Sequence, residues 1–419
     1  MDKLALHGGA PVRTRPWVSK YMGSEELGSQ EKARVLQVLD KKRIFRYLPT
    51  SLESSESNAL EEEYKTFLGT QHALAVNSGT SALICALVAA GVGPGDEVLL
   101  PAYTWVATAA AVTMVGALPV LCEIDSSLTL DPQDMAKKIT ARTKAVIAVH
   151  MRGISADMDG ILSVAREHGI MVIEDAAQAN GGTYKGRMLG SIGDLGCFSL
   201  QQSKVITAGE GGMLVTDSEK LWQRAVLYHD GAGYQFRFIE RKIPAFPGQN
   251  YRLTELQAAL CLGQLEKLPA ILAKTQRNKG QLIARLRGRP EIELSPVFGT
   301  ERDLGVSLIF YVQDGPKAQE VARALTAEGI PAFHVYDQKE KDQHTYMNWE
   351  FLLAKRDPWG GSFPWSLRPD RELDYTKDTC PVSLELLNRA VQIHLNHLVT
   401  DEDLDDIVVA VDKVAAHFL

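Results

Sequence analysis

The fold is decided by residues 144–177, KAVIAVHMRGISADMDGILSVAREHGIMVIEDAA. The runs 144–150 and 171–177 are short and apolar on both faces, which is typical of strands buried in a parallel sheet. Residues 158–169, between these runs, have the spacing of an amphipathic helix. A strand, a helix and a second strand in this order predict a right-handed crossover that connects parallel strands.

The same alternation extends from about Ser24 to Leu268. Further helices are expected at 59–69, 79–91 and 104–116, and further strands at 72–78, 96–102 and 118–125. The predicted fold is therefore α/β, with a large domain whose mostly parallel sheet is flanked by helices. Ligands of such sheets bind at the carboxyl ends of the strands.

A change of pattern after Leu268 marks a second domain. A basic helix, a strand–helix–strand run over 307–336 and a last helix over 401–418 indicate a smaller α/β unit. Between these elements, residues 337–379 show little periodicity and are expected to form an irregular excursion. We therefore divide the chain into an N-terminal arm, a large domain and a small C-terminal domain: 1–23, 24–268 and 269–419.

Composition restricts the class of partner. A net charge of -7 gives no electrostatic support for nucleic-acid binding, so we expect a small-molecule partner. The five cysteines are widely spaced and lack a CxxC pattern, which predicts reduced core thiols and no metal site. The N-terminus lacks the apolar core of a signal peptide, and the longest weakly polar run, 106–121, falls short of the ~20 residues of a membrane span. A cytoplasmic protein without membrane contact is expected.

A candidate phosphate site lies in VNSGTSALICAL, where Ser78, Gly79, Thr80 and Ser81 open a helix directly after a strand. Free backbone N–H groups at a helix N-terminus, hydroxyl donors and a glycine that lets an anion approach suit a phosphate. Taken alone, the motif is also that of an ordinary helix cap.

Two more strand ends carry candidate ligand contacts. Trp105, in PAYTWVATAA, would suit a planar ligand, although an aromatic residue there is also typical of a core. Asp175 ends an apolar strand in MVIEDAAQANGG, where an unpaired carboxylate would be costly. A protonated pyridine nitrogen would be a suitable partner, with Gln178 one helical turn further on. A helix cap or a salt bridge is the alternative for Asp175.

The stretch FSLQQSKVITAGEGGMLVTD, residues 198–217, places Lys204 between the end of a strand and a glycine-rich turn. Lys204 follows Ser199 by five residues and Asp175 by 29. A lone loop lysine is usually solvated. Together, however, a phosphate site, a ring-stacking side chain, a carboxylate for a ring nitrogen and an amine for a Schiff base fit pyridoxal 5'-phosphate (PLP).

Five motifs carry a family resemblance: NSGTSAL, PAYTWVATA, VIEDAAQANGGTYKGRMLGSIGDLGCFSLQQSK, TAGEGGMLVT and GQNYRLTELQAALCLGQLEKL. The chain resembles the DegT/StrS-type PLP-dependent sugar and cyclitol aminotransferases, of the aspartate aminotransferase fold (fold type I). The resemblance implies Lys204 as the Schiff-base lysine, Asp175 on the pyridine nitrogen and Trp105 against the ring. It also implies that the phosphate and the ring hydroxyl are held by Gly79, Thr80, Ser81, Gln178 and Ser199. Asn250 is implied to reach the phosphate of a neighbouring subunit, so a homodimer is expected.

The resemblance also narrows the substrates. The amino donor is expected to be glutamate or glutamine. FSLQQSK is similar to members that act on keto-cyclitols such as inososes, whereas YKGRMLGSIGD and ANGG resemble the octulosonate 8-aminotransferases. In AVHMRGISADMD, His150, Met151 and Arg152 stand where many nucleotide-sugar members carry tyrosine or leucine. The acceptor is thus expected to be a keto-cyclitol, a nucleotide-linked keto-sugar or an 8-oxo-octulosonate.

Two of these residues have two interpretations each. His150 is either a hydrogen-bonded core residue, which we favour, or an acid catalyst. Arg152 either binds the donor carboxylate or forms a surface ion pair.

The expected reaction is a ping-pong amino transfer in which Lys204 acts as the base while Asp175 keeps the pyridine ring protonated. Related dehydratases replace this lysine by histidine, so the presence of Lys204 argues against that activity. A non-catalytic PLP-binding regulator would need a DNA-binding element, which is missing here. A nicotinamide dehydrogenase would need a glycine fingerprint, which is also missing.

Overall fold

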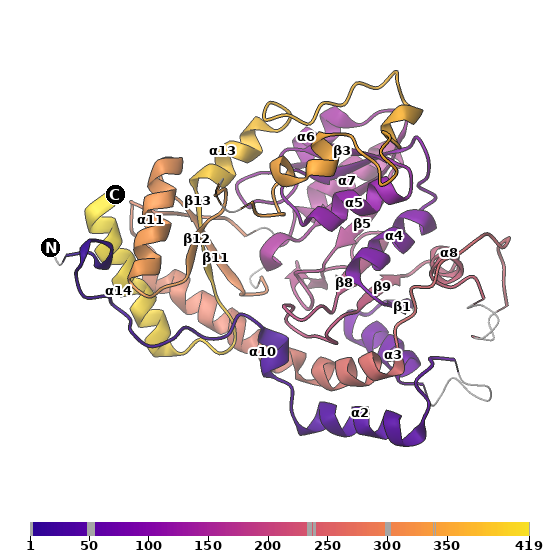
Figure 1. Cartoon of the computed structure of the whole chain (residues 1–419), viewed down its shortest axis with the longest axis horizontal. Helices are drawn as coiled ribbons and strands as arrows, with labels where there is room; N and C mark the ends of the chain where they lie inside the picture. The colour runs from indigo at the N-terminus through magenta and orange to yellow at the C-terminus, as the bar shows by residue number, and fades with distance from the viewer. Residues whose placement is uncertain are drawn as a thin grey trace.

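The structure is a computed structural model that describes residues 3–47, 55–232, 237, 240–297, 303–337, 339 and 341–418. It contains two main sheets, with a long helix, α10 (Glu255–Leu286), running beneath both (Figure 1). A two-stranded hairpin of β6 (Thr183–Tyr184) and β7 (Arg187–Met188) accompanies them.

The larger sheet has seven strands in the order β1-β9-β8-β5-β4-β2-β3. Their bounds in that order are His72–Val76, Gly212–Thr216, Leu195–Ser199, Met171–Asp175, Thr143–Val149, Glu97–Pro101 and Leu118–Cys122. The five strands from β8 to β3 pair in parallel, whereas β9 is antiparallel to both of its neighbours. The predicted α/β fold with a mostly parallel sheet is confirmed.

Helices cover both faces of this sheet because its strands are apolar on both sides. Ala145, Ile147 and Val149 of β4 pack on one face of the sheet, whereas Val146 and Ala148 pack on the other. The helices of the first face are α4 (Gly79–Ala89), α5 (Val106–Met114) and α8 (Glu219–His229). Those of the second are α3 (Glu56–Leu68), α6 (Pro132–Lys138), α7 (Met158–His168) and α10.

The smaller sheet is antiparallel, with the order β10-β11-β13-β12. Its strands span Glu293–Leu294, Ser307–Tyr311, Ala390–His394 and Ala332–His334, in that order. Helices α11 (Gly315–Ala327) and α14 (Asp401–Phe418) pack on it around a separate apolar core. The predicted domain boundary at Leu268 falls inside α10, which continues through Pro269 and contributes to the cores of both sheets. The proposed division at 268 therefore crosses a continuous helix.

The N-terminal arm lies along the small domain before it reaches the large one (Figure 1). Leu4 is fully buried in the core of the small domain, and Arg13 forms ion pairs of 2.5 Å with Asp403 and 2.9 Å with Asp406 on α14. The chain then forms two helices, α1 (Met22–Glu25) and α2 (Ser29–Lys41), of which α2 packs against α10. The arm thus bridges the two domains.

The irregular excursion packs along the large domain, from the carboxyl end of β2 at Ala102 to the amino end of that strand at Glu97. Its helical turns are η3 (Tyr346–Asn348), α12 (Glu350–Leu353) and η4 (Trp365–Leu367), and it leads into α13 (Pro381–Arg389). Trp349 is fully buried in the core of the large domain, and its indole N–H donates to the Gln343 carbonyl oxygen at 2.8 Å. The backbone N–H of Thr104 donates to the His344 carbonyl oxygen at 2.9 Å. The excursion therefore belongs, by packing, to the large domain.

None of the helices in the described part of the chain combines the length and apolar character needed to cross a membrane.

Replacing Trp349 by Ala should lower the free energy of unfolding by about 3–5 kcal/mol, because it leaves a cavity where a large buried side chain was. The matched control is Trp359→Ala in the same excursion, since Trp359 is 81% exposed. This control should change stability by less than about 0.5 kcal/mol. Urea denaturation measures both values, and equal losses would contradict the described packing of the excursion.

Candidate active site

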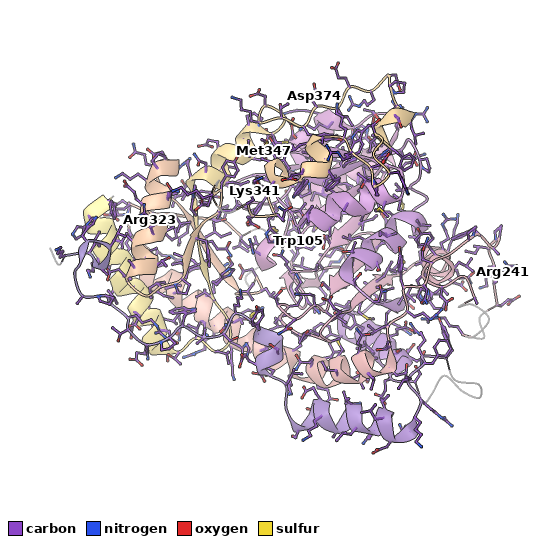
Figure 2. The ribbon with its side chains drawn as sticks, in the orientation of Figure 1. Trp105, Arg241, Arg323, Lys341, Met347 and Asp374 are labelled. Carbon is purple, nitrogen blue, oxygen red and sulfur yellow. The ribbon has the colours of Figure 1, made fainter. Side chains whose placement is uncertain are left out.

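A cavity of about 900 Å³ opens where β4, β5 and β8 end. Its wall includes three segments from outside the large sheet: the N-terminal arm at 17–22, the small sheet around His394, and the excursion at His344. In Figure 2, Trp105 lies near the centre of the molecule, between the two sheets. The cavity therefore has the position predicted from the sequence, at the carboxyl ends of the parallel strands.

The N-terminus of α4 forms one wall. Gly79 and Thr80 line the cavity together with Ser199 at the end of β8. A side chain at position 79 would place its Cβ 2.9 Å from the Ser199 Cβ, so only glycine allows this close approach. Ser81 lies behind this wall: its hydroxyl donates to Asn77 Oδ1 at 2.7 Å and its backbone N–H donates to Ser78 Oγ at 3.0 Å. Of the predicted phosphate ligands, Ser81 is thus engaged in the helix cap.

Asp175 lines the cavity and is only 5% exposed. Thr108 Oγ1 donates to its Oδ2 at 2.9 Å, and the backbone N–H of Ala177 donates to its Oδ1 at 3.1 Å. Burial raises the pKa of Asp175, although these two donors and the charge of Lys204 each act to lower it. The carboxylate is therefore incompletely compensated, which suits a cation bound in the cavity.

Lys204 extends into the cavity from a tightly held loop. Its backbone N–H donates to the Gln201 oxygen at 2.9 Å, and its carbonyl oxygen accepts the Gly23 N–H at 3.1 Å. Within the described residues, nothing is hydrogen-bonded to its Nζ. Burial lowers the pKa of Lys204, the charge of Asp175 opposes that change, and Arg152 adds to it. A lowered pKa favours the neutral amine, which is the nucleophilic form.

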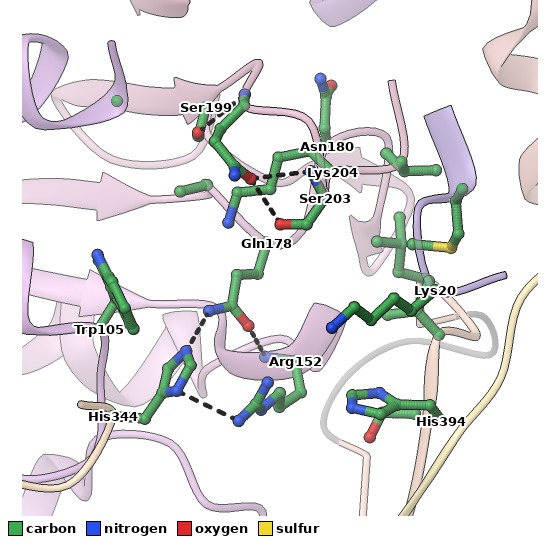
Figure 3. A pocket seen from close by; sticks show the side chains of 18 of the residues that line it. Lys20, Trp105, Arg152, Gln178, Asn180, Ser199, Ser203, Lys204, His344 and His394 are labelled. Carbon is green, nitrogen blue, oxygen red and sulfur yellow. Dashed lines mark hydrogen bonds between the residues drawn. The ribbon is translucent and has the colours of Figure 1, made fainter. Parts of the chain in front are cut away.

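Gln178, Arg152 and His344 form a hydrogen-bonded network opposite Lys204 (Figure 3). Gln178 Oε1 accepts the backbone N–H of Arg152 at 3.1 Å, and Gln178 Nε2 lies 3.1 Å from His344 Nε2. The ring of Trp105, which is 46% exposed, has its centroid 4.9 Å from that of His344. Sequence reasoning did not single out His344, because the excursion that carries it has no periodicity.

His150 lies outside the cavity, in the core. Its Nδ1 accepts the Ala156 N–H at 3.2 Å, so the network assigns the proton to Nε2, which donates to Glu174 Oε2 at 2.9 Å. The favoured interpretation as a hydrogen-bonded core residue is confirmed. Arg152, in contrast, lines the cavity and also forms a 3.4 Å ion pair with the partly exposed Asp342, so both interpretations of Arg152 stay open.

Asn250 is exposed and pairs as an isolated β-bridge with Asp230, just before α10. It is not part of the wall of its own chain's cavity. Its implied contact with a neighbouring subunit stays a prediction.

The sequence matches the DegT/DnrJ/EryC1/StrS aminotransferase family over residues 26–356. The chain belongs to this family. The resemblance noted from the motifs is therefore confirmed, and the protein is an aminotransferase.

Among curated relatives, an L-glutamine:2-deoxy-scyllo-inosose aminotransferase of Streptoalloteichus tenebrarius is 35% identical. That match covers 99% of this chain and 98% of the relative. A GDP-perosamine synthase of Caulobacter vibrioides is 44% identical, over 55% of this chain and 62% of the relative.

Solved structures of similar proteins include an aminotransferase from Psychrobacter cryohalolentis, with a TM-score of 0.77 and 28% identity over 97% of this chain and 100% of that chain. A 3-amino-5-hydroxybenzoic acid synthase has a TM-score of 0.77 and 27% identity over 97% of this chain and 99% of that chain. These structures are similar over nearly the whole chain. The predicted fold, that of the type I PLP-dependent transferases, is confirmed.

The family implies PLP, and the cavity fits it. A buried carboxylate with too few donors suits a protonated ring nitrogen, and an amine with a lowered pKa suits Schiff-base formation. The helix N-terminus at Gly79, where a larger side chain would collide with Ser199, suits a phosphate group. The individual roles of these residues stay proposals.

Asp175→Asn should lower turnover by on the order of 100–1,000-fold, because the variant keeps the shape of the side chain and loses its charge. Steady-state kinetics on the PLP-loaded enzyme measures the change. Thr108→Val, which removes one donor to Asp175 and leaves the charge, is the control and should have the smaller effect. Near-normal turnover of Asp175→Asn would refute the assigned role.

Proposed function

We propose that this aminotransferase transfers an amino group from L-glutamine or L-glutamate to a carbonyl carbon of a sugar or cyclitol, in ping-pong order. The observation that carries the proposal is that Lys204 and Asp175 face one cavity, in which each shifts the pKa of the other. One cavity of about 900 Å³ is large enough for both substrates to use it in turn.

A keto-cyclitol is the acceptor that the comparisons favour. Relatives named as inosose aminotransferases match 99% or more of this chain, whereas the match to the GDP-perosamine synthase covers 55%. The nucleotide-linked keto-sugar is therefore the second candidate. The octulosonate candidate is supported by sequence motifs alone.

Each residue of the cavity would have a separate role in this reaction. The first turn of α4, with Thr80 and Ser199, would hold the phosphate, and Trp105 would lie against the ring. Asp175 would keep a proton on the ring nitrogen. When bound, PLP supplies an electron sink that acidifies the hydrogen on the donor carbon. Lys204 Nζ would then accept that proton and, in the second half-reaction, deliver a proton to the acceptor carbon.

Lys204 should be the residue that binds PLP covalently, because its amine has a lowered pKa and no partner among the described residues. Borohydride reduction followed by peptide mapping should place the cofactor on Lys204. Lys204→Ala should lose the absorbance of the bound cofactor, and the exposed Lys185→Ala should keep it. A labelled peptide elsewhere in the chain would refute the assignment.

The acceptor is best identified with half-reactions. The enzyme is first converted by L-glutamine to its amino form and then mixed with single carbonyl compounds. We expect 2-deoxy-scyllo-inosose to restore the original absorbance faster than a nucleotide-linked 4-keto-sugar does. The reverse order would exchange the first and second candidates.

We further propose that the active unit is a homodimer in which Asn250 of one subunit reaches the phosphate of the other. Its exposed position on the loop before α10, outside its own cavity, supports this arrangement. Asn250→Asp should inactivate the enzyme, because a carboxylate repels a phosphate dianion.

Mixing Asn250→Asp with Lys204→Ala should restore about a quarter of the wild-type activity, because half of the subunit pairs are mixed and each mixed pair has one intact site. Unmixed samples are the controls, and subunit exchange is verified by mass spectrometry of the native dimer. Complete exchange without recovered activity would exclude a shared site.

A further inference from the structure

Positive charge is in excess at one end of the cavity. Arg152, Lys20, His344 and His394 line this end, which Figure 3 shows across from Lys204. Burial and the charge of Arg152 lower the pKa of both histidines to about 4, so at neutral pH they add no charge. The basic side chains that remain at this end are those of Arg152 and Lys20.

Among the described residues, the guanidinium of Arg152 has only weak partners. Its nearest acceptors are the Tyr103 hydroxyl at 3.3 Å from Nε and Asp342 Oδ2 at 3.4 Å from Nη2. A charge-assisted N–H···O bond normally measures ~2.7–2.9 Å, and an arginine–carboxylate pair is frequently bidentate. Asp342 provides neither the short distance nor the second contact.

His344, which lies beside Arg152, does not accept a hydrogen bond from the guanidinium either. His344 Nδ1 lies 2.6 Å from Asp342 Oδ1, so it carries the proton that the carboxylate accepts. His344 Nε2 then accepts from the side-chain amide of Gln178, at 3.1 Å. With Nδ1 protonated, the 3.3 Å approach of Arg152 Nη2 to that atom is not a hydrogen bond. The donors of this guanidinium thus retain unused capacity, although its side chain is only 18% exposed.

The backbone of Arg152 has a strained conformation. Arg152 has a φ of 55°, in the left-handed region that side chains other than glycine, asparagine and aspartate rarely adopt. Gln178 Oε1 fixes the conformation by accepting the Arg152 N–H. Strain of this kind is stored where function requires a group to be preorganised.

Arg152 also lies close enough to Lys204 for its charge to lower the pKa of that amine. In an α-amino acid, the carboxylate is attached to the reacting carbon. A donor whose α-carbon lies beside Lys204 therefore places its carboxylate near the positive charge of Arg152. An anchored carboxylate fixes the orientation of the hydrogen that Lys204 removes.

We propose that Arg152 anchors the α-carboxylate of the amino donor through a bidentate ion pair, an inference that rests on the proposed amino transfer. The anchor makes the donor half-reaction selective for α-amino acids over simple amines. The acceptor half-reaction with an uncharged keto-cyclitol does not depend on it.

The test compares Arg152→Gln with the wild type in each half-reaction. For L-glutamine, kcat/KM should fall by on the order of 100-fold, because a buried charge pair is lost. The rates with 4-aminobutanamide, which lacks the carboxylate, and with 2-deoxy-scyllo-inosose in the acceptor half-reaction should fall much less. Their decrease reflects only the loss of the Arg152 charge near Lys204, which affects all three reactions alike. Arg152→Lys keeps the positive charge but not the planar, two-pronged guanidinium. Its kcat/KM for L-glutamine should therefore lie between those of the wild type and Arg152→Gln.

Binding supplies a readout that is independent of turnover. Titration calorimetry of the PLP-loaded enzyme with 4-carbamoylbutanoate, a glutamine analogue without the amino group, should show about 100-fold weaker binding to Arg152→Gln. Neutral glutaramide should bind both proteins equally. Lys20→Gln tests the other cation, and a larger loss in that variant than in Arg152→Gln would overturn the assignment.

The outcomes separate the two proposals. If wild-type enzyme reacts with neither L-glutamine nor L-glutamate, the proposed amino transfer fails. If wild-type enzyme reacts and Arg152→Gln keeps its kcat/KM for L-glutamine, only the anchor fails. Loss of all three half-reactions together with a lower melting temperature would show a structural role for Arg152 and would also overturn the anchor.

Discussion

Two neighbouring carboxylates at the end of β5 set up the site. Glu174 and Asp175 point to opposite faces of the sheet, as consecutive strand residues do. Glu174 is fully buried and accepts hydrogen bonds from the backbone N–H groups of Gly190, Ile192 and Gly193, and from His150. Asp175 is nearly as buried but has two donors. One carboxylate is satisfied by the fold, and the other faces the cavity, where a cationic ligand would suit it.

The loop after β5 shows what satisfying Glu174 requires. A Cβ at position 196 would lie 1.8 Å from the Gly190 oxygen, and a Cβ at position 193 would lie 2.7 Å from the Val172 oxygen. Only glycine permits these approaches, which bring three N–H groups to one carboxylate. The end of β5 is thereby fixed, so Asp175 is held by the sheet rather than by a flexible loop, as a preorganised charge requires.

Sequence reasoning located the parts of the site that follow regular elements. Asp175, Ser199 and Lys204 come at or just after strand ends, where period and composition are informative. His344 was missed because it lies in an excursion that is held by side-chain packing around Trp349 and by backbone hydrogen bonds at Thr104, neither of which leaves a periodic pattern. Likewise, a change of pattern after Leu268 suggested a boundary, but α10 continues through this point because its buried face packs on both domains.

The charged groups around Lys204 influence whether its amine is protonated. In water a lysine amine, with a pKa near 10.4, is protonated at neutral pH and can neither attack a carbonyl carbon nor accept a proton. Burial and Arg152 together disfavour the ammonium form of Lys204, whereas Asp175 favours it. A cationic ring nitrogen beside Asp175 would take over the attraction that otherwise acts on Lys204. Occupation of the Asp175 position by such a cation would therefore lower the pKa of Lys204 further, so binding at one side of the cavity prepares the base at the other.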